Sequence, residues 1–200
     1  MTRHALNLVA PKGRPSTLKQ DSTGEWELIY GARTSPESFA ILYRRYYPAI
    51  LRYVRHRVGD EHLARDLVAE TFMTALENLH SYRDRGLPFC SWLYRLATSR
   101  ISRWARRRRI PLTVEFDELA HCKSERVDRS QALNDLTRQA LLDLPLRYQD
   151  ALALHYLEGL SVREVAQTLK VREGTIKARL FRGRERLRLK LAPYAGDWLS

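Results

Sequence analysis

Residues 161–191 constrain the fold of this chain more than any other segment, because they predict two helices joined by a tight turn. A capping box opens the first helix, since the side chains of Ser161 and Glu164 can each accept a hydrogen bond from the backbone amide of the other residue. Apolar residues then recur at helical spacing as far as Leu169. Lys170 and the residue after it form the turn.

The second helix of this pair is predicted from about Arg172 and has two contrasting faces. Its apolar stripe, at three- and four-residue spacing, consists of Ile176, Leu180, Gly183, Leu187 and Leu191. Its outer surface carries Thr175, Lys177, Arg179, Arg182, Arg186 and Arg188. A short helix, a tight turn and a basic second helix are typical of a helix-turn-helix that enters the DNA major groove. The alternative is an ordinary solvated helical hairpin; the agreement of cap, turn, stripe and basic face favours DNA binding.

The charge balance points to a polyanionic partner. The chain of 200 residues has a formal net charge of +12 and a sequence pI of about 10.1. A chain with this positive charge favours nucleic acid or a membrane surface as its partner. No apolar run is long enough to span a bilayer, and the first residues lack the apolar core of a signal peptide, so we expect a cytoplasmic protein without membrane insertion.

Periodicity divides the chain into segments and predicts an all-α fold. We expect a disordered basic tail over residues 1–24, a helical bundle over 25–109, a flexible linker over 110–131, a second small bundle with the helix-turn-helix over 132–192, and a C-terminal tail over 193–200. No alternating strand pattern of useful length interrupts these segments.

Three amphipathic helices account for the first bundle. Ser35 and Pro36 provide an N-cap and a proline at the first helical position. The next helix is predicted over residues 61–79 with Leu76 on its inner side, and the third begins near Phe89.

The third helix combines arginines with aromatic residues. Its last turns are an arginine run, which by itself is explained by the favourable position of cations at a helix C-terminus. Trp92, Tyr94 and Trp104 lie among Arg95, Arg100 and Arg103 on the same helix. Aromatic side chains interleaved with cations suit stacking on unpaired bases together with phosphate contacts, so we predict nucleic-acid binding by this helix.

Asp66 and Glu70 place two carboxylates on one face of the second helix, because they are four residues apart. Paired carboxylates can act as general acid and base. No His or Lys at a fixed spacing completes such a site, so we interpret the pair as a solvated patch or a surface for a protein partner.

Signatures of enzymes, metals and cofactors are missing. The sequence contains no P-loop, dinucleotide-binding turn, nucleophile elbow or zinc-protease motif. His121 and Cys122 are adjacent, but no second Cys or His lies at ligand spacing, and Cys90 fits a reduced core thiol. We therefore expect no metal, no cofactor and no enzymatic activity.

Two groups of motifs separated by the linker resemble one family. The motifs are Leu-Tyr-Arg-Arg-Tyr-Tyr (42–47), Asp-Leu-Val-Ala-Glu-Thr-Phe (66–72), Phe-Cys-Ser-Trp-Leu-Tyr-Arg-Leu-Ala (89–97), Leu-Pro (144–145), Tyr-Leu-Glu-Gly-Leu-Ser (156–161), Glu-Val-Ala (164–166), Gly-Thr-Ile-Lys-Ala-Arg-Leu (174–180) and Arg-Gly-Arg (182–184). In this order and spacing the chain resembles an extracytoplasmic-function (ECF) sigma factor, a group IV member of the sigma-70 family, over about residues 26–192.

The resemblance implies an alternative sigma factor that binds RNA polymerase core and directs promoter-specific initiation. The residues implied for the minus-thirty-five element are Arg172, Glu173, Thr175, Lys177, Ala178, Arg179, Phe181 and Arg182. Those implied for the minus-ten element are Trp92, Arg95, Ser99, Arg100, Arg103, Arg106 and Arg107. Those implied for polymerase docking are Asp66, Leu67, Glu70, Thr71 and Phe72. The implied partners are the beta-prime clamp and beta flap of polymerase core, promoter DNA and, as for many family members, an anti-sigma factor.

Two positions depart from the family pattern. Ser99 stands where the family commonly has Asn, and Arg172 stands where a better N-cap is usual. A stand-alone helix-turn-helix regulator is the alternative function; the first bundle argues against it, since it resembles no sensor domain. A basic RNA-binding adaptor is a third, weaker interpretation.

Overall fold

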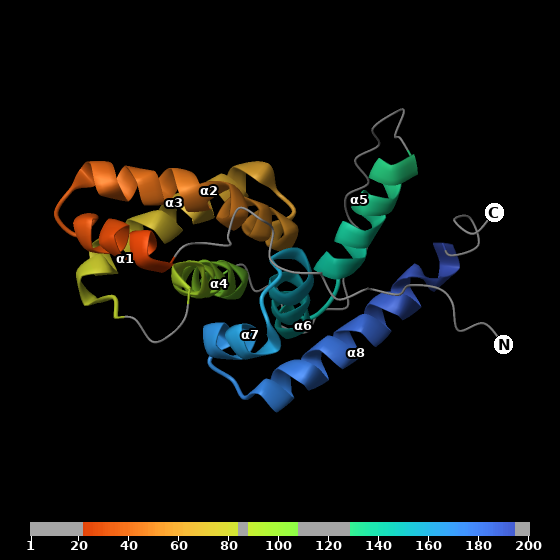
Figure 1. Ribbon diagram of the computed structural model, residues 1–200. Coiled ribbons are helices and arrows are strands. Elements are labelled where there is room, and N and C mark those ends of the chain that lie inside the picture. The colour runs from red at the N-terminus through yellow and green to blue at the C-terminus, as the bar shows by residue number, and fades with distance from the viewer. Residues whose placement is uncertain (1–21, 84–87, 108–128, 195–200) are drawn as a thin grey trace.

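The computed structural model describes residues 22–83, 88–107 and 129–194, and every regular element in these ranges is helical (Figure 1). Most of the predicted N-terminal tail and linker, and residues 195–200, lie outside the described residues. The last three residues of the predicted linker are the first residues of a helix, because helix α5 begins at Arg129.

The helices form two units. The first unit contains α1 (Ser22–Gly31), α2 (Pro36–Val58), α3 (Glu61–Asn78), the 3-10 turn η2 (Leu79–Ser81) and α4 (Phe89–Arg107). The second unit contains α5 (Arg129–Leu142), α6 (Leu146–Leu152), the π-helical segment η3 (Ala153–Leu157), α7 (Val162–Leu169), α8 (Glu173–Leu191) and the 3-10 turn η4 (Ala192–Tyr194). An all-α fold built from two helical units is thereby confirmed.

Local sequence signals determine where the long helices of the first unit begin and end. The hydroxyl of Ser35 accepts a hydrogen bond from the Ser38 amide at 3.2 Å and caps α2, whose first residue is a proline. Gly59 ends α2 in the left-handed region, with a φ of 74°, and donates its amide to Arg55. The carboxylate of Asp60 then caps α3 by accepting from the Leu63 amide at 2.8 Å.

Apolar stripes of α2, α3 and α4 pack together to form the core of the first unit. Its largest fully buried side chains are Tyr46, Tyr53 and Tyr94. The prediction that Leu76 faces inward is wrong, since 45% of this residue is exposed. Ala75 in the last turn of α3 and Leu79 at the start of η2 occupy the buried side, so Leu76 falls on the outer side.

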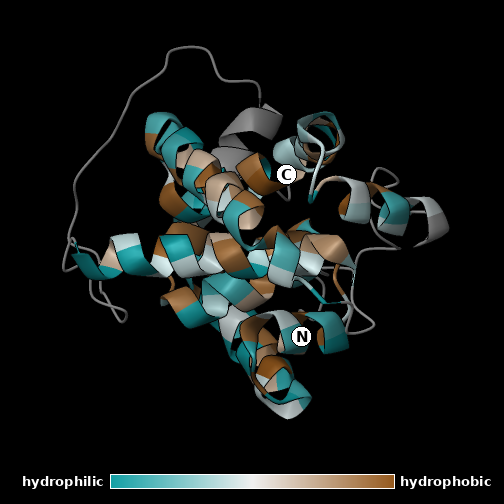
Figure 2. Ribbon diagram, turned by 90° about the vertical axis from the view of Figure 1, so that its left-hand side faces the viewer, coloured by the Kyte–Doolittle hydropathy of each residue, from teal (hydrophilic) through white to brown (hydrophobic). Residues whose placement is uncertain are grey.

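The helix-turn-helix is formed by α7 and α8, as predicted. Both hydrogen bonds of the capping box between Ser161 and Glu164 are present, and Lys170 ends α7 in the left-handed conformation, with a φ of 55°. The predicted inner stripe of α8 is buried along its full length, from Ile176 to Leu191. Hydrophilic and hydrophobic residues alternate along the helices (Figure 2), as is typical of helices with one buried face.

The two units pack against each other. Helix α7 lies against α4, and α2 contacts both α5 and η3, so the buried apolar residues form one continuous cluster across both units (Figure 1). Among the helices of the described ranges, none has the length and hydropathy needed to cross a bilayer.

Candidate nucleic-acid and polymerase interfaces

Helix α8 presents its predicted DNA-contacting residues to solvent. Seven of these residues are exposed and Arg179 is half-buried; the exposed ones are Arg172, Glu173, Thr175, Lys177, Ala178, Phe181 and Arg182. Arg172 is the N-cap of α8 but makes no side-chain capping hydrogen bond, as its departure from a good cap predicts. The guanidinium of Arg172 therefore does not cap the helix. It stands at the N-terminal end of α8, and residues at this end of a recognition helix contact base edges.

Helix α4 offers a second basic surface. Ser99, Arg103, Arg106 and Arg107 are exposed on it. Arg100 is different, because its guanidinium lies 3.3 Å from a carboxylate oxygen of Glu70 on α3 and also donates to the Thr74 hydroxyl. A residue predicted to contact DNA and a residue predicted to contact polymerase thus form an ion pair on one surface.

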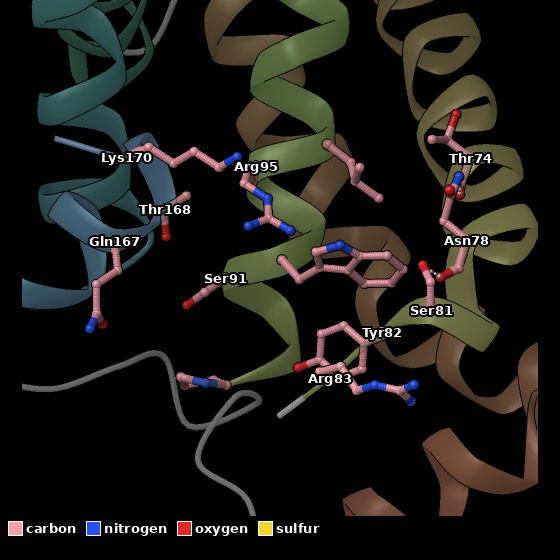
Figure 3. A pocket seen from close by; sticks show the side chains of 13 residues that line it. Thr74, Asn78, Ser81, Tyr82, Arg83, Ser91, Arg95, Gln167, Thr168 and Lys170 are labelled. Carbon is pink, nitrogen blue, oxygen red and sulfur yellow. Dashed lines mark hydrogen bonds between the residues drawn. The ribbon is translucent and has the colours of Figure 1, made fainter. Parts of the chain in front are cut away.

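A cavity of about 440 Å³ opens at the N-terminal part of α4 (Figure 3). It is lined by Thr74, Asn78, Ser81, Tyr82, Arg83, Pro88, Ser91, Trp92, Arg95, Leu96, Gln167, Thr168 and Lys170. Trp92 and Arg95 are predicted minus-ten residues, and the last three lining residues come from α7 and the turn after it. The side chain of Lys170 extends from the second unit toward Arg95 of the first (Figure 3). The cavity therefore combines stacking and cationic groups of the first unit with polar groups of the second.

Contact with Tyr82, the residue after η2, helps to hold Trp92 in place. The Trp92 ring lies 4.8 Å from the Tyr82 ring, which is stacked on Trp26 of α1 at 5.9 Å. Arg33 donates to the Tyr82 carbonyl at 2.9 Å. This cluster could not be predicted, because Trp26 and Tyr82 belong to segments without a common periodicity.

The predicted polymerase-docking residues separate into exposed and buried groups on α3. Asp66 and Glu70 are exposed. The side chains of Leu67, Thr71 and Phe72 lie in the core, so they cannot meet a partner directly in this conformation. In this conformation they anchor the helix that presents the two carboxylates. An exposed residue that the sequence analysis did not select, Met73, adjoins these carboxylates in a shallow surface depression.

Buried polar contacts that no sequence pattern predicts connect the two units. Arg57 of α2 donates to a carboxylate oxygen of Asp150 of α6 at 2.6 Å and also donates to the side-chain amide oxygen of Gln149. The Arg57 side chain is only 1% exposed. Tyr53 donates to the same Asp150 oxygen at 3.3 Å. Burial by itself lowers the pKa of Arg57, but the charges and hydrogen bonds of Asp150 and Tyr53 together outweigh it and raise the pKa, so the guanidinium stays charged.

A second buried carboxylate, that of Glu158, completes these contacts. Glu158 follows η3, is fully buried, and accepts from Arg52 of α2 at 2.6 Å and from the Tyr94 hydroxyl of α4 at 2.6 Å. Burial and the neighbouring Glu158 charge raise the pKa of Tyr94, which therefore remains a hydrogen-bond donor. Both buried carboxylates of the second unit are thus held by cations and hydroxyls of the first.

The described residues contain no group of three or more His, Cys, Asp or Glu side chains that could hold a metal ion. Cys90 is buried and makes no disulfide. His121 and Cys122 lie outside the described residues.

Comparison with known proteins identifies the family. Residues 42–110 match the family described as Sigma-70 region 2, and residues 135–187 match Sigma-70, region 4. The ECF RNA polymerase sigma factor SigE of Mycolicibacterium smegmatis is 30% identical over 196 residues, covering 94% of this chain and 73% of SigE. The chain belongs to the ECF sigma factors of the sigma-70 family.

A further relative agrees with this assignment, and a solved structure has the same fold. The ECF RNA polymerase sigma factor BldN of Streptomyces coelicolor is 32% identical over 168 residues, which cover 81% of this sigma factor and 64% of BldN. The solved structure of the sigma factor RpoE, in complex with the anti-sigma factor NepR from Bartonella quintana, has the same fold. Its TM-score is 0.62 at 22% identity, with 78% of this chain and 98% of RpoE covered. Sigma factors are transcription initiation factors, so the family is not one of enzymes.

Proposed function

We propose that this sigma factor directs RNA polymerase core to promoters through three surfaces. The exposed carboxylates of Asp66 and Glu70 on α3 dock on the clamp of the core enzyme. The first unit binds the minus-ten element along α4 and in the adjoining cavity. Helix α8 reads the minus-thirty-five element, and the rest of the second unit meets the beta flap.

The observation that carries this proposal is the division of α8 into a buried stripe and an exposed basic face, directly after a capped α7 and a three-residue turn. A recognition helix needs a fixed inner side to define which residues face the groove. Exposed Arg and Lys side chains then contact phosphates or base edges, and base contacts provide the specificity.

The minus-ten assignment is supported by the chemistry of the cavity. Trp92 offers a stacking surface, and Arg83, Arg95 and Lys170 supply positive charge. Stacking on an unpaired base contributes about 1–3 kcal/mol, and cations along the groove hold the backbone. Such a cavity suits a single strand with an unstacked base better than a duplex.

The stand-alone regulator is disfavoured, because the first unit matches sigma region 2 and carries the second basic surface. An anti-sigma factor remains a proposed partner, by analogy with the complex of RpoE.

Run-off transcription with purified core polymerase across a genomic promoter library tests the proposal. We expect core plus this protein to start transcription at a limited set of promoters that core alone does not use. Transcripts whose start sites are the same with and without the protein would overturn the proposal.

A further inference from the structure

The cavity beside α4 receives positive charge from both units. Arg83 and Arg95 belong to the first unit and Lys170 to the second, and none of the described residues that line the cavity is acidic. Its volume of about 440 Å³ lies within the range of about 300–1,000 Å³ that is typical of small-molecule sites. The cavity therefore has the size and the charge for a small anionic ligand.

Polar side chains on the α3 side of this cavity are already hydrogen-bonded to the backbone. Thr74 donates to the Glu70 carbonyl at 2.8 Å. Asn78 donates to the Thr74 carbonyl and Ser81 donates to the Asn78 carbonyl, both at 2.9 Å. The hydroxyl protons on this side are thus used within the protein, so they do not select a ligand.

On the α7 side, two buried hydroxyls lack such a partner. Ser91 of α4 is 1% exposed and Thr168 of α7 is 3% exposed, and neither hydroxyl makes a hydrogen bond among the described residues. Both residues line the cavity, where α4 faces α7 (Figure 3). A buried hydroxyl without a partner costs free energy, which an acceptor bound in the cavity would recover.

The donors at this end of the cavity suit a phosphate group. A phosphomonoester carries a charge of about −1.5 to −2 near pH 7 and has three strong acceptor oxygens. The side chain of Lys170 extends toward Arg95, so two cations adjoin the two hydroxyls (Figure 3). Charge-assisted hydrogen bonds to phosphate are stronger than those between neutral groups. Ser91, Arg95, Thr168 and Lys170 are called the anion subsite below.

Trp92 adds an aromatic surface to the same cavity. Its ring packs against Tyr82 at 4.8 Å and against Phe89 at 5.3 Å, so its position is fixed. Every nucleobase has a flat π-face that can stack on such a ring. A phosphate ion by itself would leave Trp92 uncovered, whereas a nucleotide would contact both the ring and the anion subsite.

We propose that this cavity binds a nucleoside monophosphate, with its phosphate in the anion subsite and its base stacked on Trp92. Trp92 and Arg95 also belong to the predicted minus-ten residues, so competition between the nucleotide and a promoter strand rests on the proposed function. The nucleotide site itself does not, because Thr168 and Lys170 lie on the second unit, to which the minus-ten assignment does not extend.

Isothermal titration calorimetry of the full chain, with adenosine monophosphate (AMP) as the probe, tests the site. We expect saturable binding at one site, with an affinity at least about tenfold higher than that for adenosine or for inorganic phosphate, since each of these fills only one part of the cavity. An absence of saturable binding at millimolar AMP would overturn the proposal. Equal affinities for AMP and for either of its parts would overturn it as well.

Thr168→Val separates a ligand contact from a structural role. The substituted methyl group replaces a hydroxyl that has no partner, so the melting temperature should stay the same or rise. The affinity for AMP should nevertheless fall by about tenfold, because a hydrogen bond to a charged group is lost. Unchanged AMP affinity in this variant would contradict the anion subsite.

Lys170→Asn tests the charge of the anion subsite, since asparagine tolerates the left-handed conformation in which Lys170 ends α7. We expect its affinity for AMP to fall at least about tenfold. Arg163→Gln is the matched control, because it removes one exposed cation from α7 at a position that does not line the cavity. It should bind AMP like the wild type; equal losses in both variants would mean that AMP is attracted only by the overall positive charge.

Displacement of a fluorescent polythymidine strand, without polymerase, separates the nucleotide site from the proposed function. We expect AMP to displace the strand, and Thr168→Val to bind the strand as tightly as the wild type does. If AMP binds to the anion subsite without displacing the strand, the minus-ten assignment of the cavity fails and the nucleotide site stands. If the strand binds and AMP does not, the nucleotide site fails and the minus-ten assignment stands.

Discussion

At the scale of single residues, burial separates side chains that the sequence presents as equivalent. Arg57 belongs to the basic last turn of α2, where cations favour the helix dipole, yet it is buried against Asp150. Arg182 is equally basic and stands exposed on α8. The chemistry of an arginine is therefore decided by the face of the helix on which it falls.

The exposed cations of α8 should differ in their roles. A side chain that reads a base edge should discriminate between promoters by about 1–3 kcal/mol, whereas a phosphate contact should weaken all sequences alike. We expect Arg182→Ala or Lys177→Ala to lower promoter transcription, and Arg188→Ala, further along the helix, to have a smaller effect. Transcription from matched and mismatched promoters measures the difference. Unchanged output from both Arg182→Ala and Lys177→Ala would show that the groove-facing surface lies elsewhere.

His56 should make the stability of the fold depend on pH. Burial lowers its pKa below 6.5, and Arg138 of α5 lowers it further, as do Arg52 and Arg55 on its own helix. The unfolded chain therefore binds the proton more readily, so stability is full above about pH 6.5 and is lost as the pH falls through the lowered pKa. Urea unfolding at pH 7.5 and pH 5.5 should show a smaller loss in His56→Gln than in the wild type; an equal loss would exclude His56 as the cause.

At the scale of elements, the helices and their caps follow from local patterns. Ser35, Ser161 and Lys170 act at helix ends as the sequence predicts, because capping and turn formation depend on residues only a few positions apart. The division of α8 into a buried apolar face and an exposed basic face also follows from a local pattern. The contact of Arg57 with Asp150 could not be predicted, since it joins residues that are 93 positions apart and carry no shared periodicity.

The contact of α8 with α6 depends on a glycine. A Cβ atom at Gly183 would meet the side chain of Leu152 at 3.1 Å and that of Tyr148 at 3.4 Å. Gly183→Ala should therefore destabilise the fold by about 1–3 kcal/mol, as overpacking does. Gly174 lies in the first turn of the same helix with nothing within 4 Å of such a Cβ, so Gly174→Ala should be neutral or stabilising by up to about 1 kcal/mol. Thermal unfolding of both variants compares the two, and equal effects would contradict the close packing.

At the scale of the whole molecule, the surfaces for polymerase and DNA share one framework. Glu70 of the predicted docking face pairs with Arg100 of the predicted DNA face. The motifs shared with the family predict both surfaces. They do not predict that Leu67, Thr71 and Phe72 lie beneath the docking face. Burial at this site depends on the packing of α2 and α4 against α3, which no single helix pattern contains.

Docking on polymerase should depend on the exposed carboxylates of α3. We expect the double variant Asp66→Ala and Glu70→Ala to bind core polymerase at least about tenfold more weakly, since charge complementarity at an interface is lost. Glu27→Ala, which removes an exposed acid from α1, is the control. Fluorescence anisotropy with purified core gives the affinities, and a double variant that binds like the control would make the docking assignment wrong.

Permanganate footprinting on a promoter identified by run-off transcription tests the central claim most directly, because permanganate oxidises unpaired thymines. The account predicts reactive thymines around the minus-ten element when core polymerase and this protein are both present, and none with either alone. A protein that binds core polymerase but leaves every thymine of the promoter protected would contradict it.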